Sequence, residues 1–420
     1  MNATFEEPRE SEERKVFVGL ARHMTTDVQP VGLLKVLQHG VMQSGEFAYG
    51  RRYLAGPAAQ ALNPDHLPLR DAAFVLPDRR LRDGGALPLT LRDALPDSWG
   101  RKVLEIQHGP LQDVDALLLT NEDRVGAMVF SESLPFALEP PLDAFPAISE
   151  LADAARRIEA GLDVPPAMHR LLRGGSLGGA RPKATFIHAG RRYIAKFASR
   201  ADDDDVEILE AATLGLAMAC GIAVPGFLVQ PLVLGNALLL ERFDRTGPIE
   251  NEFRFHYLSA SAFLDAPYES NQGSYAELAQ ALRRISSRPE QDLQELFRRL
   301  VFNLCVGNTD DHVKNHGVLH QGHGFWRLAP AFDMVPQFNA NVGAQGMAIL
   351  PGRNESRLAL AREAAPQFGL GAAAAERVIR TIGDTVVGQA SAAITAIGGR
   401  AALARHMKAY VEQQADRIRS

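Results

Sequence analysis

Cysteine is scarce in this chain: Cys220 and Cys305 are the only two in 420 residues. Both lie in apolar stretches with helical spacing, and nothing around them has the spacing of zinc ligands. A disulfide framework and a zinc site are therefore not expected, and the composition suits a reducing compartment.

Positive charge is not in excess either, since 45 Lys and Arg residues face 50 Asp and Glu residues and the net charge is −5. Such a chain has no overall basic field to hold nucleic acid. The end of the chain is locally basic, through Arg400, Arg405, Lys408, Arg417 and Arg419. Direct, tight binding of DNA is therefore not expected.

Long apolar runs are also missing. No stretch approaches the roughly 18 apolar residues of a membrane-spanning helix, and residues 1–13 are acidic and polar, unlike a secretion signal. We expect a soluble, cytoplasmic protein without a membrane partner.

The chain is long enough for two or three subdomains, each with its own core. Residues 1–14 are predicted to be a loose tail, because they contain few apolar groups. Residues 15–134 are predicted to form a first subdomain, which a proline-dense connection follows. Residues 147–246 are expected to form a sheet lobe that binds nucleotide, and residues 247–420 a helical lobe.

Two hairpins with one helix between them are expected in the sheet lobe: strands 185–188 and 193–197, the helix 206–220, and strands 227–234 and 237–240. Apolar residues at helical spacing follow in 293–305, and residues 372–420 are rich in alanine. The predicted fold class is therefore α+β. It is a two-lobed, protein-kinase-like fold with a mixed N-terminal sheet lobe, an extra N-terminal subdomain and an all-helical C-terminal lobe.

The segment from Asn308 to Asn315 carries the clearest chemistry. Asp310 and Asn315 are five residues apart, as are the catalytic Asp and the metal-binding Asn of protein kinases. Asp333 follows in an apolar setting, where an ionised carboxylate is costly unless a cation such as Mg²⁺ compensates it. These residues predict phosphoryl transfer, with Asp310 near the accepting hydroxyl and Asn315 and Asp333 sharing Mg²⁺. The competing interpretation makes the acids helix caps or turn residues.

A glycine-dense loop at 174–183 precedes a predicted strand, and its bare backbone amides could approach phosphates closely. Lys196 ends the next strand, where a kinase keeps the lysine that contacts phosphates, and Glu210 on the following helix could pair with it. The alternative is a plain turn and a solvated lysine at a strand edge. The order of loop, lysine and acidic helix favours the phosphate site.

The apolar strand predicted at 238–240 is followed directly by a run rich in charged residues, from Glu241 to Arg245. Backbone groups just past such a strand can read an adenine edge, and Asp244 could accept a hydrogen bond from a ribose hydroxyl. A hairpin exit without a ligand is the competing account.

Several short sequence motifs follow one another along the chain, from about Lys15 to the C-terminal helices. In the first subdomain they are Gly45 to Tyr49, Leu67 to Leu69, Leu95 to Gly100 and Asp123 to Ala127. In the later part they are Ser176 to Lys183, Lys196, Glu241 to Arg245, Asp310 to Asn315 and Leu328 to Asp333. This set resembles the HipA family of bacterial serine/threonine kinases, the toxin halves of HipA–HipB toxin–antitoxin pairs.

The resemblance implies a role for each matching residue. Asp310 is the implied catalytic base, and Asn315 and Asp333 are the implied Mg²⁺ ligands. The implied ATP contacts are Ser176, Lys183, Lys196, His312 and Lys314, with Glu241 and Phe243 at the hinge and Asp244 at the ribose. Ser176 is also implied as an autophosphorylation site, where nearly two added negative charges would repel ATP.

The resemblance further implies a HipB-like DNA-binding antitoxin that holds the kinase inactive. The implied substrate is a component of translation, an aminoacyl-tRNA synthetase in the family. The chain departs from the family pattern in two places. Arg181 and Pro182 replace the Gln-Glu of some members, and Asp311 adds a charge where a small residue often stands.

Two other functions remain open. The first is a catalytically weak nucleotide-binding corepressor in a DNA-bound antitoxin complex, although the intact Asp310, Asn315 and Asp333 argue against it. The second is a small-molecule phosphotransferase of the aminoglycoside-kinase type, which the N-terminal subdomain disfavours.

Overall fold

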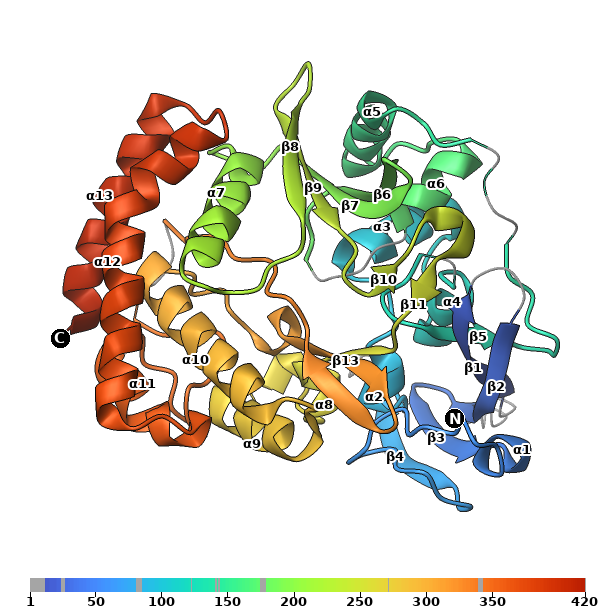
Figure 1. The fold of residues 1–420 in the computed structure, drawn as a ribbon. Helices are drawn as coiled ribbons and strands as arrows, with labels where there is room; N and C mark the ends of the chain where they lie inside the picture. Colours follow the sequence, from blue (N-terminus) through green and yellow to red (C-terminus); the bar gives the residue numbers. More distant parts are fainter. Residues whose placement is uncertain are drawn as a thin grey trace, which may run out of the picture.

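The computed structural model describes the chain with short gaps (Figure 1). The described residues are 12–23, 27–80, 85–121, 123–139, 142, 144–173, 179–270, 272–338 and 343–419. Most of the predicted tail lies outside them. Residues 12–14 do not belong to a tail, because the first strand already begins at Glu12.

An antiparallel sheet dominates the N-terminal subdomain. Its strands are β1 (Glu12–His23), β2 (Asp27–His39), β3 (Met42–Tyr49), β4 (Phe74–Arg80), β5 (Met128–Ser131), β10 (Arg245–Thr246) and β11 (Phe253–Arg254). The order is β10-β11-β1-β2-β3-β4, with β5 also paired to β1. Alternate residues of β3 are buried, as expected for a strand with one face on a core. Because β10 and β11 come from residues 245–254, this sheet crosses the predicted domain boundary.

Four short helices accompany this sheet: α1 (Arg51–Leu54), α2 (Leu89–Arg92), α3 (Ser98–His108) and α4 (Asp113–Leu118). Asp97 starts α3 as its N-cap, because its carboxylate accepts a hydrogen bond from the backbone N–H of Gly100 at 2.8 Å. This helix runs toward the sheet lobe, where Trp99 joins the apolar core of α5 and α6.

The sheet lobe has the predicted order of elements: α5 (Ile148–Glu159), α6 (Pro166–Arg173), β6 (Lys183–His188), β7 (Arg191–Phe197), α7 (Val206–Ala219), β8 (Phe227–Pro231) and β9 (Asn236–Glu241). The four strands form an antiparallel sheet in the order β6-β7-β9-β8. Both predicted hairpins and the helix between them are confirmed. The β6–β7 turn has positive φ angles at Ala189 and Gly190, of 48° and 72°.

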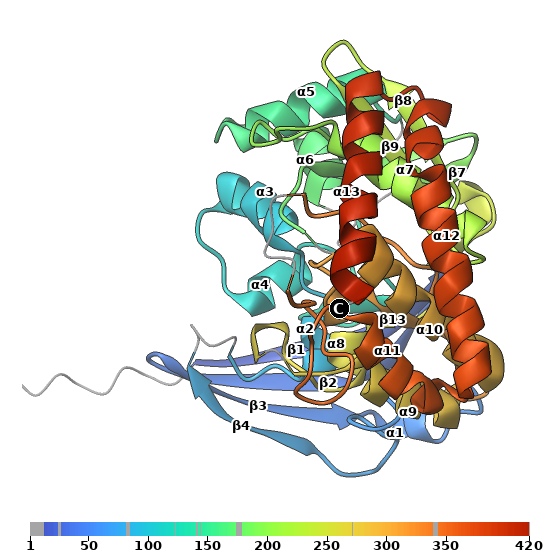
Figure 2. The same ribbon diagram turned by 90° about the vertical axis from the view of Figure 1, so that its left-hand side faces the viewer.

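Helices make up most of the C-terminal part: α8 (Ala260–Phe263), α9 (Tyr275–Ile285), α10 (Pro289–Val306), α11 (Leu358–Ala364), α12 (Ala372–Ala396) and α13 (Ala401–Arg419). The predicted helix at 293–305 is α10, which begins with Pro289 and ends at the left-handed Gly307, where φ is 71°. Helices α12 and α13 lie side by side on one flank of the molecule, and α12 also packs on α7 (Figures 1 and 2).

The prediction of an all-helical C-terminal lobe is wrong. A three-stranded antiparallel sheet lies within it, formed by β12 (Tyr257–Ser259), β13 (Gly317–Gly322) and β14 (Phe325–Leu328). Its hairpin turn runs through His323 and Gly324, whose φ angles are 51° and 78°. Short strands joined by a tight turn give a weaker hydrophobic pattern than the long apolar stripe of α10. The sequence therefore predicted helices alone in this part of the chain.

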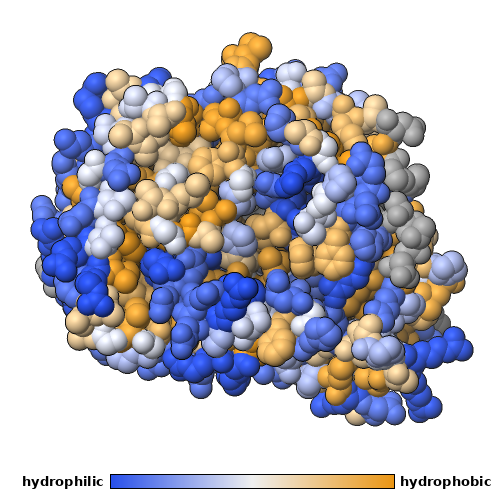
Figure 3. Space-filling view, in the orientation of Figure 1, coloured by the Kyte–Doolittle hydropathy of each residue, from blue (hydrophilic) through white to orange (hydrophobic). Residues whose placement is uncertain are grey.

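The surface carries one clear apolar projection. Between β8 and β9, the side chains of Val233 and Leu234 are 97% and 63% exposed, and this tip stands at the top of the face in Figure 3. In the part of the chain that the structure describes, no helix combines the length and the apolar character needed to cross a membrane.

Candidate nucleotide and catalytic site

A cavity of about 600 Å³, here called the Lys196 cavity, lies between the sheet lobe and the helical part. Its lining includes four predicted site residues, Lys183, Lys196, Asp310 and Asp333. Lys183 on β6 and Lys196 on β7 are directly paired in the sheet register. Because cross-strand partners point to the same face, both lysines belong to the cavity side of the sheet.

Lys196 lies at the centre of an ion-pair cluster. Its Nζ atom is 2.7 and 2.8 Å from the two carboxylate oxygens of Glu210 on α7, and 2.8 Å from Oδ1 of Asp333. The predicted pairing of Lys196 with Glu210 is therefore present. An ammonium group has three N–H donors, and these three bonds use all of them.

Burial and charge act against one another in this cluster. Burial opposes ionisation of Lys196, but the two carboxylates outweigh it and raise the pKa of the lysine above its usual value. Burial also opposes ionisation of Asp333, yet the charge and hydrogen bond of Lys196 hold the pKa of that carboxyl below its usual value. For Glu210 burial dominates, and its pKa is raised. A cluster of this kind is typical of sites that bind charged ligands.

Asp333 adopts a backbone conformation that residues other than glycine rarely take, with φ of 58°. Such a conformation costs on the order of 1–3 kcal/mol and persists where the surroundings impose it. Here Phe332, directly before it, is buried and stacks on Phe243, with ring centroids 5.5 Å apart. The strained turn directs the carboxylate of Asp333 to Lys196.

Asp310 lies exposed at the Lys196 cavity, while Asn315 is buried beside it. The Nδ2 atom of Asn315 donates to the backbone carbonyl of Asp310 at 3.1 Å. This hydrogen bond joins the two ends of the segment from Asp310 to Asn315. Desolvation at the cavity raises the pKa of Asp310; His312 opposes this shift, and the carboxylates of Asp333 and Asp311 add to it. A raised pKa suits a group that has to take up a proton.

The donor set fits a divalent cation. The Oδ1 atom of Asn315 is buried, and no described group hydrogen-bonds to it. Asp333 supplies a carboxylate at the Lys196 cavity, and Asn315 lies next to that cavity through its bond to Asp310. Mg²⁺ prefers oxygen ligands of these two kinds. Among the described residues, no group of three His, Cys, Asp or Glu side chains is arranged to hold a metal ion. A metal here would therefore complete its coordination with phosphate and water oxygens.

The structure does not bring all predicted contacts to the cavity. The carboxylate of Asp244 is fully buried and is held by Arg242, whose Nε and Nη2 atoms each donate to it at 2.7 Å. The backbone N–H of Gly126 donates to the same carboxylate at 2.8 Å. Burial alone would raise the pKa of Asp244, but these arginine contacts hold it well below the usual value. No oxygen of Asp244 faces the cavity to meet a ribose.

The two residues predicted for the hinge have other neighbours. Glu241 is partly exposed and pairs with Arg191 at 2.5 Å. Phe243 lies in a small apolar cluster, between Tyr257 and Phe332. Neither residue lines the Lys196 cavity as described. Ser176 lies outside the described residues.

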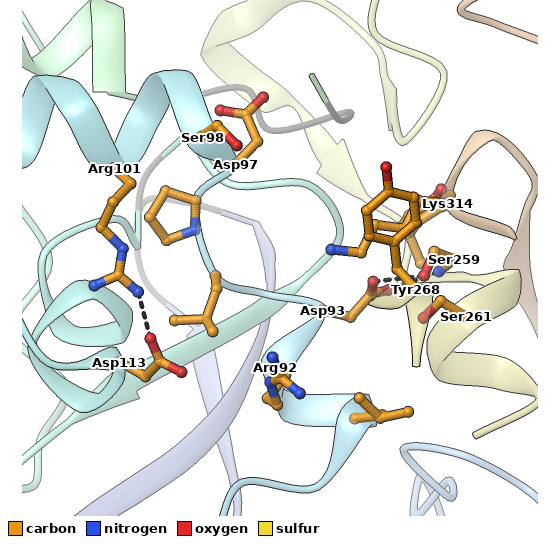
Figure 4. Close-up of a pocket in the computed structure, with 14 residues that line it drawn as sticks. Arg92, Asp93, Asp97, Ser98, Arg101, Asp113, Ser259, Ser261, Tyr268 and Lys314 are labelled. Carbon is orange, nitrogen blue, oxygen red and sulfur yellow. Dashed lines mark hydrogen bonds and ion pairs between the residues drawn. The ribbon is translucent and has the colours of Figure 1, made fainter. Parts of the chain in front are cut away.

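His312 and Lys314, predicted to contact ATP, turn toward Tyr268. The ring centroids of His312 and Tyr268 are 4.7 Å apart, and Nζ of Lys314 lies 5.5 Å from the centre of the Tyr268 ring. Lys314 lines a second cavity of about 240 Å³, here called the Lys314 pocket. In Figure 4 the ammonium group of Lys314 points toward Asp93, which is hydrogen-bonded to Ser259. On the other side of the pocket, Arg101 forms an ion pair with Asp113.

The N-terminal subdomain supplies residues to the site that pattern reasoning did not find. Asp97 accepts a hydrogen bond from Nζ of Lys183, and so links the Lys314 pocket with the Lys196 cavity. Trp99 donates from its indole nitrogen to the carbonyl oxygens of Leu172 and Lys183 at 3.1 and 2.8 Å. The run Leu95 to Gly100 predicts the start of a helix and is one of the family motifs, but its local spacing does not indicate these partners.

A lysine held by a helix glutamate, opposite a loop that bears Asp310 and Asn315, is the arrangement of kinase-like proteins. A family model described as the HipA-like C-terminal domain matches residues 175–391. The chain belongs to this family, as the sequence motifs predicted.

One solved structure has a similar fold over almost the whole length of this chain. HipA in the Shewanella oneidensis MR-1 complex of HipA, HipB and operator DNA superposes with a TM-score of 0.69, over 96% of this chain and 97% of that one. At 18% identity this likeness concerns the fold. The mixed α/β architecture is therefore confirmed.

Two curated relatives come from Sinorhizobium fredii. "Putative kinase Y4mE" is 32% identical over 134 residues, which is 30% of this chain and 31% of that protein. "Putative kinase Y4dM" is 29% identical over 153 residues, or 36% of each chain. The matches thus span about a third of the length of either relative, and they support a kinase-like enzyme in general terms.

Proposed function

We propose that this protein is an ATP- and Mg²⁺-dependent serine/threonine protein kinase that acts as the toxin of a toxin–antitoxin pair. One observation carries the proposal. The Lys196 cavity gathers a lysine paired with Glu210, an exposed Asp310 and the strained Asp333. Positioning and charge stabilisation are nearly all that phosphoryl transfer requires of a protein.

In this proposal each side chain has a distinct task. Asp310, whose pKa is raised, accepts the proton of the attacking hydroxyl. Asn315 and Asp333 would hold Mg²⁺, which neutralises phosphate charge when bound. Lys196 and Lys183 contact phosphate oxygens. Because all three N–H donors of Lys196 are in use, a phosphate can take one only when a bond to Glu210 or to Asp333 is given up.

The predicted division of the chain becomes part of the proposal. Residues 15–134 form the first subdomain, residues 147–246 the nucleotide-binding part of the sheet lobe, and residues 247–420 the part with the catalytic loop. The bonds of Trp99 and Asp97 to β6 support a working connection between the first two parts.

The partners are proposed by analogy. The Shewanella HipA was solved with HipB and operator DNA, and a HipB-like antitoxin is proposed to hold this chain inactive. An aminoacyl-tRNA synthetase is the proposed substrate, so that phosphorylation inhibits translation in the cytoplasm. Ser176 is the proposed autophosphorylation site. Contact with operator DNA is proposed to be indirect or weak.

Transfer of labelled phosphate tests the kinase function. The purified protein is incubated with labelled ATP and Mg²⁺, alone and with a cell lysate, beside Asp310→Ala and Ser176→Ala. We expect label on the wild-type protein and on a lysate protein. Asp310→Ala should lose both, whereas Ser176→Ala should lose only self-labelling.

The alternatives give other results. ATP binding without transfer to any protein would sink the kinase proposal and favour the corepressor. Transfer to a small molecule alone would favour the phosphotransferase. For the toxin role, induced expression should arrest growth, Asp310→Ala should relieve the arrest, and arrest that persists in this variant would contradict a toxic kinase activity.

A further inference from the structure

Asp311 is a buried acid next to the proposed base, and the proposed chemistry does not use it. Asp310 is exposed at the cavity, whereas Asp311 is 1% exposed. Two consecutive carboxylates therefore point in opposite directions, one to the ligand side and one into the core of the helical part. A buried carboxylate is costly unless donors satisfy it, so its partners indicate what it holds in place.

Two side chains satisfy this carboxylate. The hydroxyl of Tyr275, the first residue of α9, donates to Oδ2 of Asp311 at 2.5 Å. The Nε2 atom of His316 lies 2.8 Å from Oδ1. The rings of Tyr275 and His316 also pack edge to face, with centroids 5.0 Å apart. Asp311 thus joins the start of α9 to the residue that follows Asn315.

A second layer extends these contacts to α10. The Nδ2 atom of Asn303 donates to the hydroxyl oxygen of Tyr275 at 3.1 Å, and Asn308 donates to Oδ1 of Asn303 at 3.2 Å. Asn303 belongs to the last turn of α10, and Asn308 opens the catalytic loop. The chain of bonds therefore starts and ends on the same loop, so that the loop is fixed to two helices.

The backbone around Asp311 is held as well. The carbonyl oxygen of Asp311 accepts a hydrogen bond from the backbone N–H of Met347, and that of Thr309 accepts one from Gly346 at 2.9 Å. A side chain at Gly346 would meet the carbonyl oxygen of Asp311 at 2.9 Å, so the two segments are in close contact. The loop cannot shift without breaking these bonds.

We infer that Asp311 is a positioning residue for phosphate transfer. It fixes the backbone from which Asp310 faces the cavity, and through His316 it fixes the position of Asn315. This inference rests on the proposed kinase function. It assigns a role to the acid that distinguishes this loop from the family pattern. Misplacement of a catalytic group by about 1 Å lowers a rate about 100-fold, and an anchor beside the base acts through this effect.

The test separates the rate of transfer from ATP affinity. Asp311→Ala removes both bonds, whereas Asp311→Asn keeps an oxygen that can accept from Tyr275. We expect Asp311→Ala to lower the self-labelling rate at saturating ATP about 10- to 100-fold, while the Kd for ATP changes less than about threefold. Asp311→Asn should recover part of the rate. Tyr275→Phe, which removes one donor, should lose less than Asp311→Ala and serves as the second variant if the alanine protein does not fold.

Asp292 provides a matched control. It is also buried in the helical part, where it accepts bonds from Ser286 and Arg327, away from the loop. Asp292→Asn should lower the melting temperature without a comparable loss of rate. The positioning role is overturned if this control loses as much rate as an Asp311 or Tyr275 variant of equal melting temperature. It is also overturned if the Asp311 and Tyr275 variants bind ATP more weakly but keep the wild-type rate at saturating ATP.

Hydrogen exchange distinguishes this inference from the proposed function. If the wild-type protein transfers no phosphate, the kinase proposal fails, but the anchor is still measurable. Amides of 308–316 and 345–348 should exchange faster in Asp311→Ala than in the wild type, and Asp292→Asn should leave them unchanged. Unchanged exchange in the alanine variant would refute the anchor.

Discussion

The indole nitrogen of Trp99 donates a hydrogen bond to the carbonyl oxygen of Lys183, at 2.8 Å. Trp99 belongs to α3 of the N-terminal subdomain, and Lys183 begins β6 of the sheet lobe. The same N–H also reaches the carbonyl oxygen of Leu172, at 3.1 Å. Both ends of the glycine-dense segment are therefore fixed by one side chain from another part of the chain.

Trp99→Phe should destabilise this connection while it keeps most of the apolar packing. Two buried carbonyl groups lose their donor, which costs about 1–3 kcal/mol of unfolding free energy. Urea denaturation measures the loss. Trypsin should also cleave faster after Arg173, which directly precedes the segment.

Trp326→Phe is the control for lost packing, because it makes the same replacement of an indole by a phenyl ring within the core of the helical part. It should leave cleavage after Arg173 unchanged. Equal cleavage of the Trp99 variant and the wild type would show that the indole does not restrain the segment.

Lys196→Met should be strongly destabilising, because it leaves Glu210 buried without a cation. The expected cost is about 3–5 kcal/mol, measured by chemical denaturation. Lys196→Met combined with Glu210→Gln should regain much of this free energy, since the buried charge of Glu210 is gone and only Asp333 remains without the lysine. Phosphate transfer should stay lost in both proteins.

An exposed pair serves as the control for this experiment. Lys35 and Glu46 lie 3.4 Å apart on the N-terminal sheet, with side chains 43% and 40% exposed. Lys35→Met should cost less than about 1 kcal/mol. If the double variant is no more stable than Lys196→Met, the buried charge of Glu210 is not the cause of the loss.

The sheet lobe was predictable because its signals are local. Ala189 and Gly190 form a tight turn between two short apolar strands, and Gly221 ends α7 with φ of 73°. Lys196, Asp310 and Asp333 could be selected from order and spacing, and Lys183 from the family resemblance. The fold gathers these four residues on one cavity. Spacing carries information when chemistry requires fixed positions on a strand or loop.

Contacts between distant segments were not predictable in this way. Asp244 follows an apolar strand just as a ribose contact would, but Gly126, 118 residues earlier, takes one of its oxygens. The indole of Trp99 likewise reaches residues 73 and 84 positions away. Such partners depend on how subdomains pack, and a single sequence carries no periodic signal for that packing.

Asp244→Asn should lower stability far more than a ribose contact would explain. The substitution leaves the guanidinium of Arg242 buried without its counter-charge, at a cost of about 3–5 kcal/mol. The pKa of Asp244 is depressed in the folded state, so its contribution is complete above the unfolded value of about 3.9 and is lost as pH falls below it. Denaturation curves of both proteins at several pH values measure the difference.

The stability difference should therefore be constant near neutral pH and shrink in acid. Asp113→Asn is the control, since Asp113 pairs with Arg101 at a partly exposed site and should cost less. A variant with wild-type stability and weakened ATP affinity would instead support the ribose role.

The pH dependence of transfer reports on Asp310. Its pKa is raised above the ordinary 3.8, chiefly by desolvation and further by the nearby carboxylates. A base must be ionised to accept a proton, so the transfer rate at saturating ATP should fall as pH drops through this raised value. The acid limb should thus lie above pH 3.8. Circular dichroism over the same range checks that the protein stays folded, and direct ATP binding should show no matching limb. The role of Asp310 as base is contradicted if the residual rate of Asp310→Asn keeps the same limb.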